Sequence, residues 1–241
     1  MPIARRHAPP RVQWALMHAF FSRFGWQILG VLCLVGAVAL GVAVHTYHIL
    51  PMDTAIYDWV HAHMITPGLT PVVRAFTQLA SAVGLIVIAV VLLIVLAVRH
   101  HARIGVAIAL NLAVEAALNE VIKAIVQRPR PSVEHLVVER GFSFPSGHAM
   151  AATAFYGFLI YLLYHYRRHT AAVWALIVAL GAIVPVIMFT RVYLGVHYAS
   201  DVLAGFLFSI AYLTLLSVPV LRCTLLRPLS AGADGQTPTA V

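Results

Sequence analysis

Long apolar runs separated by short polar connectors dominate the hydrophobic pattern of the chain. A helix needs about 20 apolar residues to cross a bilayer. Six runs reach or approach that length, so we predict membrane-spanning helices at 26–46, 80–98, 104–126, 147–166, 171–190 and 200–221. The third and fourth runs are the least uniform, but the basic connectors RHHAR at 99–103 and YRRH at 166–169 delimit both. The pattern predicts an all-α, six-span transmembrane bundle with both termini on one side.

Outside these spans, the chain has one longer connecting segment and two terminal segments. Residues 51–79 carry apolar positions at helical spacing, Trp59, and breaks at Pro67, Gly68 and Pro71. This pattern predicts short amphipathic helices that lie on the outer membrane interface. We expect one domain over 26–221 between two cytoplasmic ends, 1–25 and 222–241, and the Ser/Gly/Pro/Thr-rich tail after Arg227 predicts disorder.

Composition and charge support a membrane protein and orient it. The chain is 61% hydrophobic and 10% charged, with a mean hydropathy of +0.90, which is outside the range of soluble domains. The net charge of +8 does not predict a nucleic-acid partner, because the bases lie beside apolar runs. Ten Lys/Arg residues lie on the N-terminal side, which predicts that this side is cytoplasmic. The outer side holds six: Arg74, Lys123, Arg128, Arg130, Arg140 and Arg191.

The polar residues that fit a bilayer worst lie where spans three and five end and spans four and six begin. These four ends share the outer face in a six-span chain. Snorkelling explains Lys and Arg near helix ends, but histidine and aspartate gain little from it. The topology therefore predicts one site that contains Lys123, Arg130, Ser146, Gly147, His148, Arg191, His197 and Asp201.

Each local pattern within this set predicts a role in binding or attacking an anion. Lys123 lies on a last helical turn, and Pro129 and Pro131 force an extended path that fixes Arg130. In FPSGH, Ser146 reads as an N-cap and Gly147 lets a ligand approach the amides of a helix start, which favour an anion.

The histidines complete a predicted reaction site. The spacing of His197 and Asp201 predicts one helical face, on which the carboxylate bonds one ring nitrogen and leaves the other free to attack. A second histidine can protonate a leaving oxygen. Three cations, a helix start, two histidines and a carboxylate predict phosphoryl transfer with no metal or other cofactor.

Three spaced motifs in this order resemble the type 2 phosphatidic acid phosphatase (PAP2) family, which shares its core with vanadium haloperoxidases and bacterial acid phosphatases. They are Lys123, six residues, then Arg130-Pro131; Pro145 to His148; and Arg191, five residues, His197, three residues, Asp201. Thr190 stands where the third motif usually has serine, and it retains the hydroxyl.

The resemblance implies a role for each matching residue. His197 would form a phosphohistidine and Asp201 would orient it, while His148 would protonate the leaving group and later activate water. The phosphoryl oxygens would be held by Lys123, Arg130, Ser146, the Gly147 amide and Arg191.

The resemblance also implies a substrate class and a location. It implies hydrolysis of a lipid phosphate or diphosphate, such as undecaprenyl diphosphate, phosphatidylglycerophosphate, phosphatidic acid or lipid A phosphate, at the outer face of a bacterial cytoplasmic membrane. Among these, the resemblance to compact six-span members of the family favours undecaprenyl diphosphate or a broad range of lipid phosphates as the substrate. No obligate protein partner is implied.

Two alternatives remain open on the sequence. A phosphotransferase would pass the phosphoryl group to an acceptor lipid, and product analysis with and without an acceptor separates it from a hydrolase. A non-catalytic lipid-binding or transport protein would keep the bundle, but it would not need His148, His197 and Asp201 together.

A polar stripe and several isolated residues receive separate interpretations. Asn111, Glu115, Asn119 and Lys123 lie four apart and predict a stripe facing the bundle interior. Interhelical contact is the favoured role, and the alternative is that Glu115 and Asn119 support Lys123. We expect four other side chains to be solvated or at the surface, with Arg128 able to contact headgroups: His61, His63, Arg128 and His135.

Overall fold

The computed structural model describes residues 10–226, with side chains from residue 24 onward, and within that range it contains helices and loops but no strand. The long helices are α1 (Pro10–Tyr47), α4 (Ala82–Val98), α5 (Ala102–Val126), α6 (Gly147–Tyr166), α7 (Ala171–Tyr193) and α8 (Ala199–Tyr212). Five described helical stretches are long and apolar enough to cross a membrane. A sixth is counted if α4 and the helix before it, bent by 50°, form one span. The predicted six-span bundle is confirmed.

The last span continues beyond α8 without leaving the helical path. A π-helical turn at Leu213–Ser217, α9 (Val218–Leu221) and a second π-helical turn at Arg222–Leu226 follow in succession. The helical path therefore continues past the predicted end at 221 as far as the structure describes the chain, to Leu226. The predicted disordered tail after Arg227 lies outside the described residues.

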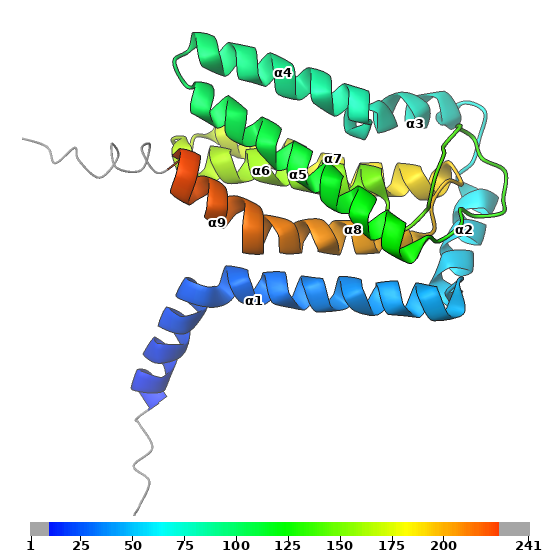
Figure 1. Ribbon diagram of the computed structural model, residues 1–241, viewed down its shortest axis with the longest axis horizontal. Helices are drawn as coiled ribbons and strands as arrows, with labels where there is room; N and C mark the ends of the chain where they lie inside the picture. The colour runs from blue at the N-terminus through cyan, green and yellow to red at the C-terminus, as the bar shows by residue number, and fades with distance from the viewer. Residues whose placement is uncertain (1–9, 227–241) are drawn as a thin grey trace, which may run out of the picture.

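Helix α6 occupies the centre of the bundle (Figure 1). It contacts α5, α7 and α8, while α4 packs on α5 and α1 packs on α8. Its buried face contributes Ala152, Phe155 and Phe158 to the main apolar core. Small residues on this face let neighbouring helices approach closely, as is usual for packing inside membranes.

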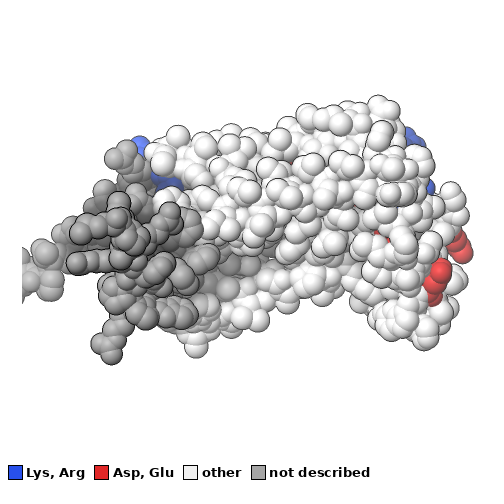
Figure 2. Space-filling view, turned by 90° about the horizontal axis from the view of Figure 1, so that it is seen from below, with Lys and Arg blue, Asp and Glu red and all other residues white. Residues whose placement is uncertain are grey.

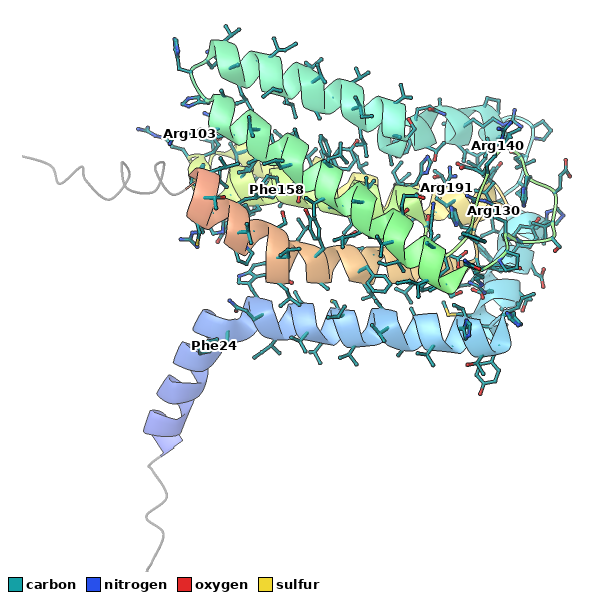
Figure 3. All side chains as sticks on the ribbon, in the orientation of Figure 1. Phe24, Arg103, Arg130, Arg140, Phe158 and Arg191 are labelled. Atoms are coloured by element: carbon teal, nitrogen blue, oxygen red, sulfur yellow. The ribbon has the colours of Figure 1, made fainter. Side chains whose placement is uncertain are left out.

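The outer surface divides into an apolar middle and charged ends. Large apolar side chains such as Val83 and Val98 of α4 and Val178 of α7 are exposed, as expected for residues that face lipid. In Figure 2 the middle of the visible face is almost free of charge, and charged side chains lie towards its ends. Figure 3 places Arg103 at one end of the bundle and Arg130, Arg140 and Arg191 at the other.

The predicted segment 51–79 folds into the two short helices α2 (Pro51–His63) and α3 (Leu69–Thr77), followed by a 3₁₀ turn at Gln78–Ala80. His61 and His63 are exposed and stack on Tyr57 and Trp59. However, α2 also packs against α7 and α8, and its Asp53 is 1% exposed. The segment is thus anchored to the bundle through Asp53, while most residues of α2 are exposed.

A glycine in α8 sets how closely the starts of α6 and α8 approach. A Cβ atom at Gly205 would lie 2.8 Å from the carbonyl oxygen of Ser146 and 3.3 Å from the Cβ of Ala149. The contact with Ser146 involves backbone, so an added methyl group has to push the two helices apart.

We expect Gly205→Ala to lower the unfolding free energy by about 1–3 kcal/mol, because overpacking outweighs the better helix propensity of alanine. Thermal unfolding in detergent measures the effect. Gly25→Ala is the matched control, since no atom lies within 4 Å of a Cβ there. Equal melting temperatures for Gly205→Ala and wild type would contradict the close packing.

Candidate active site

The ends of α5 and α7 and the starts of α6 and α8 meet at one end of the bundle, beneath the loop of residues 127–146 (Figures 1 and 3). The loop is closed at its base by a hydrogen bond from the Ser143 amide to the Arg128 carbonyl (2.8 Å). Farther out, the Leu136 amide donates to the Leu194 carbonyl (3.0 Å). The helix ends thus converge as the sequence predicts.

His197 lies in the turn between α7 and α8 and is 3% exposed. Its Nδ1 is 3.6 Å from a carboxylate oxygen of Asp201, and its Nε2 is 3.3 Å from a guanidinium nitrogen of Arg130. The predicted pairing with Asp201 is present, but its predicted basis is wrong. Helix α8 begins at Ala199, so the two residues do not share a helical face; the turn, in which Gly195 has φ +71°, brings His197 to the carboxylate.

Asp201 is fully buried and is held by several donors. Its carboxylate accepts hydrogen bonds from the Ser143 hydroxyl, from the Tyr198 amide (2.9 Å) and from the guanidinium of Arg128. Ser143 Oγ also lies 3.4 Å from Nδ1 of His197. This environment fixes the carboxylate opposite the imidazole.

Arg128 and Ser143 are two members of this environment that the sequence interpretation misses. Arg128 is 2% exposed, so its expected place among solvent or headgroups is wrong. It is buried because acceptors from α2, α8 and the end of α1 surround its guanidinium. No local sequence signal marks either residue, since their partners lie far away along the chain.

The start of α6 has the geometry expected of an anion site. Ser146 is the N-cap, as predicted, yet its buried Oγ has no hydrogen-bond partner in the described part of the chain. A Cβ at Gly147 would lie 3.7 Å from the ammonium of Lys123 and 3.2 Å from Oδ1 of Asn119. The helix start, a free hydroxyl and a cation therefore meet within a few ångströms.

Arg191 and Arg130 supply the other two cations. Arg191 is 1% exposed and donates to Thr77 Oγ1 (3.0 Å) and to Glu139, while its buried Nε has no partner among residues 24–226. Arg130 donates to the Val196 carbonyl (2.9 Å), and its guanidinium lies 3.8 Å from Glu139. Glu139 therefore bridges both arginines, a role that its sequence context does not reveal.

His148 lies in the first turn of α6, next to Gly147. Arg191, His197, Lys123 and Arg130 are all near enough to interact with it electrostatically. The structure thus brings together all eight residues of the predicted site.

The three supporting residues differ in what they contact. Thr190 Oγ1 lies 3.1 Å from Thr77 Oγ1, which in turn accepts from Arg191. The amide of Asn119 donates to the Pro145 carbonyl (3.4 Å) and to the sulfur of Met150 (3.0 Å). Glu115 is 1% exposed, and its Oε1 has no partner in the described chain.

The predicted polar stripe faces the interior. Asn111 is its purely interhelical member: its side-chain amide donates to the Ala154 carbonyl of α6 (3.1 Å). The Ser217 hydroxyl reaches its Oδ1 (2.5 Å) from the continuation of α8. Asn111 thus joins three helices, whereas Asn119 lies beside the start of α6.

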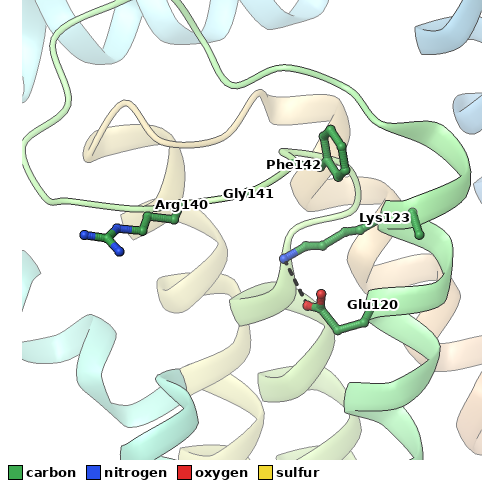
Figure 4. A pocket seen from close by; sticks show the side chains of 6 residues that line it. Glu120, Lys123, Arg140, Gly141 and Phe142 are labelled. Carbon is green, nitrogen blue, oxygen red and sulfur yellow. Dashed lines mark ion pairs between the residues drawn. The ribbon is translucent and has the colours of Figure 1, made fainter.

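A pocket of about 300 Å³ adjoins the site on the α5 side (Figure 4). Its lining comes from α5 and the loop: Glu120, Lys123, Ala124, Arg140, Gly141 and Phe142. Lys123 Nζ lies 3.6 Å from Glu120, which is the ion pair drawn in Figure 4. The pocket has both charged and apolar walls, and one of its lining residues is Lys123 of the site.

Burial and nearby cations keep the imidazole of His197 neutral. Burial is the main cause that lowers the pKa of His197 to about 4, and Arg191 and Arg130 lower it further against the opposing effect of Asp201. Burial also lowers the pKa of Arg130, opposed by Glu139 and Asp201. Between Phe24 and Leu226, no group of three or more His, Cys, Asp or Glu side chains is arranged to hold a metal ion.

Comparisons with known proteins agree with the motifs. The model of the PAP2 superfamily matches residues 103–223, about half of the chain, so the chain belongs to this superfamily. It is a membrane-embedded phosphatase by this membership and by its relatives. Phosphatidylglycerophosphatase B of Bacillus subtilis (strain 168) is 33% identical over 172 residues, covering 69% of this chain and 82% of the relative.

Two further matches extend this relation. An undecaprenyl-diphosphatase of Sulfolobus acidocaldarius is 30% identical over 129 residues, covering 51% of this chain and 57% of the relative. The crystal structure of a transmembrane PAP2 type phosphatidylglycerolphosphate phosphatase from Bacillus subtilis superposes with a TM-score of 0.69 at 26% identity. That match covers 88% of this chain and 98% of the other, so it includes nearly the whole bundle.

The lowered pKa of His197 makes a prediction about stability against pH. Between its usual value near 6.5 and about 4, the unfolded chain binds a proton at His197 that the folded chain does not. Stability is therefore lost as the pH falls through this window, by about 2–3 kcal/mol for this group. We expect thermal unfolding in detergent between pH 7 and 4.5 to show a shallower loss for His197→Gln than for wild type. The same loss of melting temperature with falling pH in His197→Gln and in wild type would contradict the lowered pKa of His197.

Proposed function

We propose that this protein hydrolyses a lipid phosphate or diphosphate through a phosphohistidine on His197. The observation that carries the proposal is the orientation of the imidazole. Its Nδ1 faces Asp201, and its Nε2 faces Arg130, which is one of the proposed phosphate-binding residues. A neutral imidazole with one nitrogen held by a carboxylate presents the other as a nucleophile.

In the first step, Nε2 of His197 attacks phosphorus and the bond to the leaving oxygen breaks. His148 gives that oxygen a proton, so the lipid leaves as an alcohol, or as a lipid monophosphate from a diphosphate. Lys123, Arg130 and Arg191 hold the phosphoryl oxygens together with Ser146 and the Gly147 amide. These donors supply the charge stabilisation that phosphoryl transfer requires.

In the second step, water attacks the phosphohistidine. His148, now neutral, takes a proton from the water, the nitrogen–phosphorus bond breaks, and inorganic phosphate leaves. Asp201 stabilises the imidazole throughout by holding Nδ1. The same sequence returns both histidines to their starting protonation states.

The substrate class is supported by the place of the site and by the relatives. The pocket beside Lys123 combines cations with the apolar wall of Phe142 and Ala124, which suits an amphiphilic phosphate at headgroup depth. The relative with the higher identity and coverage is named phosphatidylglycerophosphatase B, so phosphatidylglycerophosphate is the first substrate to test. Undecaprenyl diphosphate, named in the other relative, is the second.

We further propose that the site lies on the outer face of a bacterial cytoplasmic membrane. The charge bias of the connectors favours this orientation. In this arrangement residues 26–221 form the phosphatase domain, and residues 1–25 and 222–241 lie on the cytoplasmic side.

Phosphate release from a panel of lipids tests the chemistry. The panel contains phosphatidylglycerophosphate, undecaprenyl diphosphate and phosphatidic acid in detergent with a chelator present. We expect His197→Ala to lower release roughly a thousandfold or more, because no other group replaces the nucleophile. The exposed Arg103 lies at the opposite end of the bundle, so Arg103→Gln serves as control. Release that persists in His197→Ala refutes the mechanism, and phosphate found on an added acceptor lipid identifies a phosphotransferase.

A covalent label makes this test more specific. With ³²P-labelled p-nitrophenyl phosphate, whose leaving group needs no proton, we expect His148→Ala to accumulate labelled protein because water activation is lost. The label should survive alkali and be lost in acid, as phosphohistidine is. A double variant that also carries His197→Ala should take up none.

Glu115 provides a separate prediction for the support of Lys123. We expect Glu115→Gln to lower turnover severalfold with a smaller effect on melting temperature, because Glu115 lies two helical turns before Lys123 on the same face of α5 and its buried Oε1 has no partner in the described residues. Turnover on phosphatidylglycerophosphate and thermal unfolding are measured together. Normal turnover with a lowered melting temperature would show interhelical contact instead.

A further inference from the structure

The guanidinium of Arg128 uses all its donors on acceptors behind the His197–Asp201 pair. One terminal nitrogen donates to Ser200 Oγ (2.8 Å) and to Asp201. The other donates to Asp53 (2.7 Å) and to the His48 carbonyl, which also accepts from Nε (2.9 Å). Cζ of Arg128 lies over the ring of Tyr198, 4.0 Å from the ring centroid. An arginine with every donor engaged cannot rotate without breaking several bonds.

Asp53 fixes this arginine from the other side. The carboxylate is 1% exposed and accepts from the Leu50 amide at the start of α2 (3.0 Å). It also accepts from the amide (2.8 Å) and the hydroxyl (2.9 Å) of Ser200 at the start of α8. Asp53 therefore ties α2, Arg128 and the first turn of α8 to one another.

The resulting chain of charges runs Asp53, Arg128, Asp201, His197. One guanidinium lies between two buried carboxylates, so each carboxylate competes for its donors and restrains its position. If Asp53 is neutralised, Arg128 loses one charged partner and is free to shift towards Asp201. A shift of Asp201 alters the direction in which Nε2 of His197 points, and a misplacement of about 1 Å can cost about a hundredfold in rate.

We infer that Arg128 and Asp53 are positioning residues of the phosphatase site, which act by holding the Asp201 carboxylate against Nδ1 of His197. The inference rests on the proposed function. Among the contacts of the described residues, both reach the reaction site through Asp201 and the first turn of α8. They should therefore set the rate of nucleophilic attack and leave the binding of the phosphate to Lys123, Arg130 and Arg191.

The experiment compares three variants of increasing severity with one control variant, which lies on α2 as Asp53 does. Ser200→Ala removes the hydroxyl shared by Arg128 and Asp53, Asp53→Asn removes one carboxylate, and Arg128→Lys keeps the charge but loses the planar fork. Asp58→Asn makes the same change of charge as Asp53→Asn at an exposed position of α2. Each purified protein is assayed for kcat and KM on phosphatidylglycerophosphate and for thermal unfolding.

We expect Asp53→Asn and Arg128→Lys to lower kcat about tenfold to a hundredfold, with KM changed less than threefold. Ser200→Ala should show a smaller loss of kcat, and Asp58→Asn none. The rate at which ³²P from p-nitrophenyl phosphate labels the protein should fall in parallel with kcat, because the attacking step is the one affected.

Two results would overturn the inference. An unchanged kcat per folded molecule with a lowered melting temperature in Ser200→Ala and Asp53→Asn would mean that the network only stabilises the bundle. A raised KM at constant kcat would mean that it contributes to binding. If His197→Ala keeps its activity, the proposed function itself fails; if His197→Ala is inactive while these variants are normal, only this inference fails.

Discussion

The absence of hydrogen-bond partners in the hydrocarbon core of a membrane governs the structure of this protein. Polar side chains within the bundle have to find partners on neighbouring helices, as Asn111 does on α6 and on the continuation of α8. Charged groups have to lie at the ends, where the helices stop. The end of the bundle that holds Arg130 and Arg191 is thus the place where the chain can concentrate cations without exposing them to lipid.

Concentrating cations creates a second requirement, because like charges repel and buried charges need partners. Glu139 forms ion pairs with Arg191 and Arg130. Asp53 and Asp201 form ion pairs with Arg128. The two sets of charges are arranged differently. Arg128 is fully engaged by protein groups, whereas buried donors at Ser146 and Arg191 keep hydrogen-bonding capacity that a phosphoryl group can use.

The spans and the three motifs could be predicted because they depend on local patterns: apolar length, prolines after Lys123, and a serine and a glycine at a helix start. The roles of Arg128, Ser143 and Glu139 could not. Arg128 bonds Asp53 and Asp201 across 75 and 73 positions of sequence, and no spacing rule connects them. The placement of His197 in a turn depends on a left-handed glycine, which a helical spacing argument does not detect.

The loop of residues 127–146, which connects α5 and α6, has an inner part that contacts His197 and an outer part that is exposed. Its inner ends hold Arg130 and Ser143 against the histidine, and the Ser143 amide closes them together. Its outer part, including Ser132, Glu134 and His135, is exposed. On the proposed function, substitutions at these exposed positions would alter how the protein contacts headgroups and leave in place the loop residues that contact His197. Such an arrangement would let the proposed reaction site be adapted to different lipids.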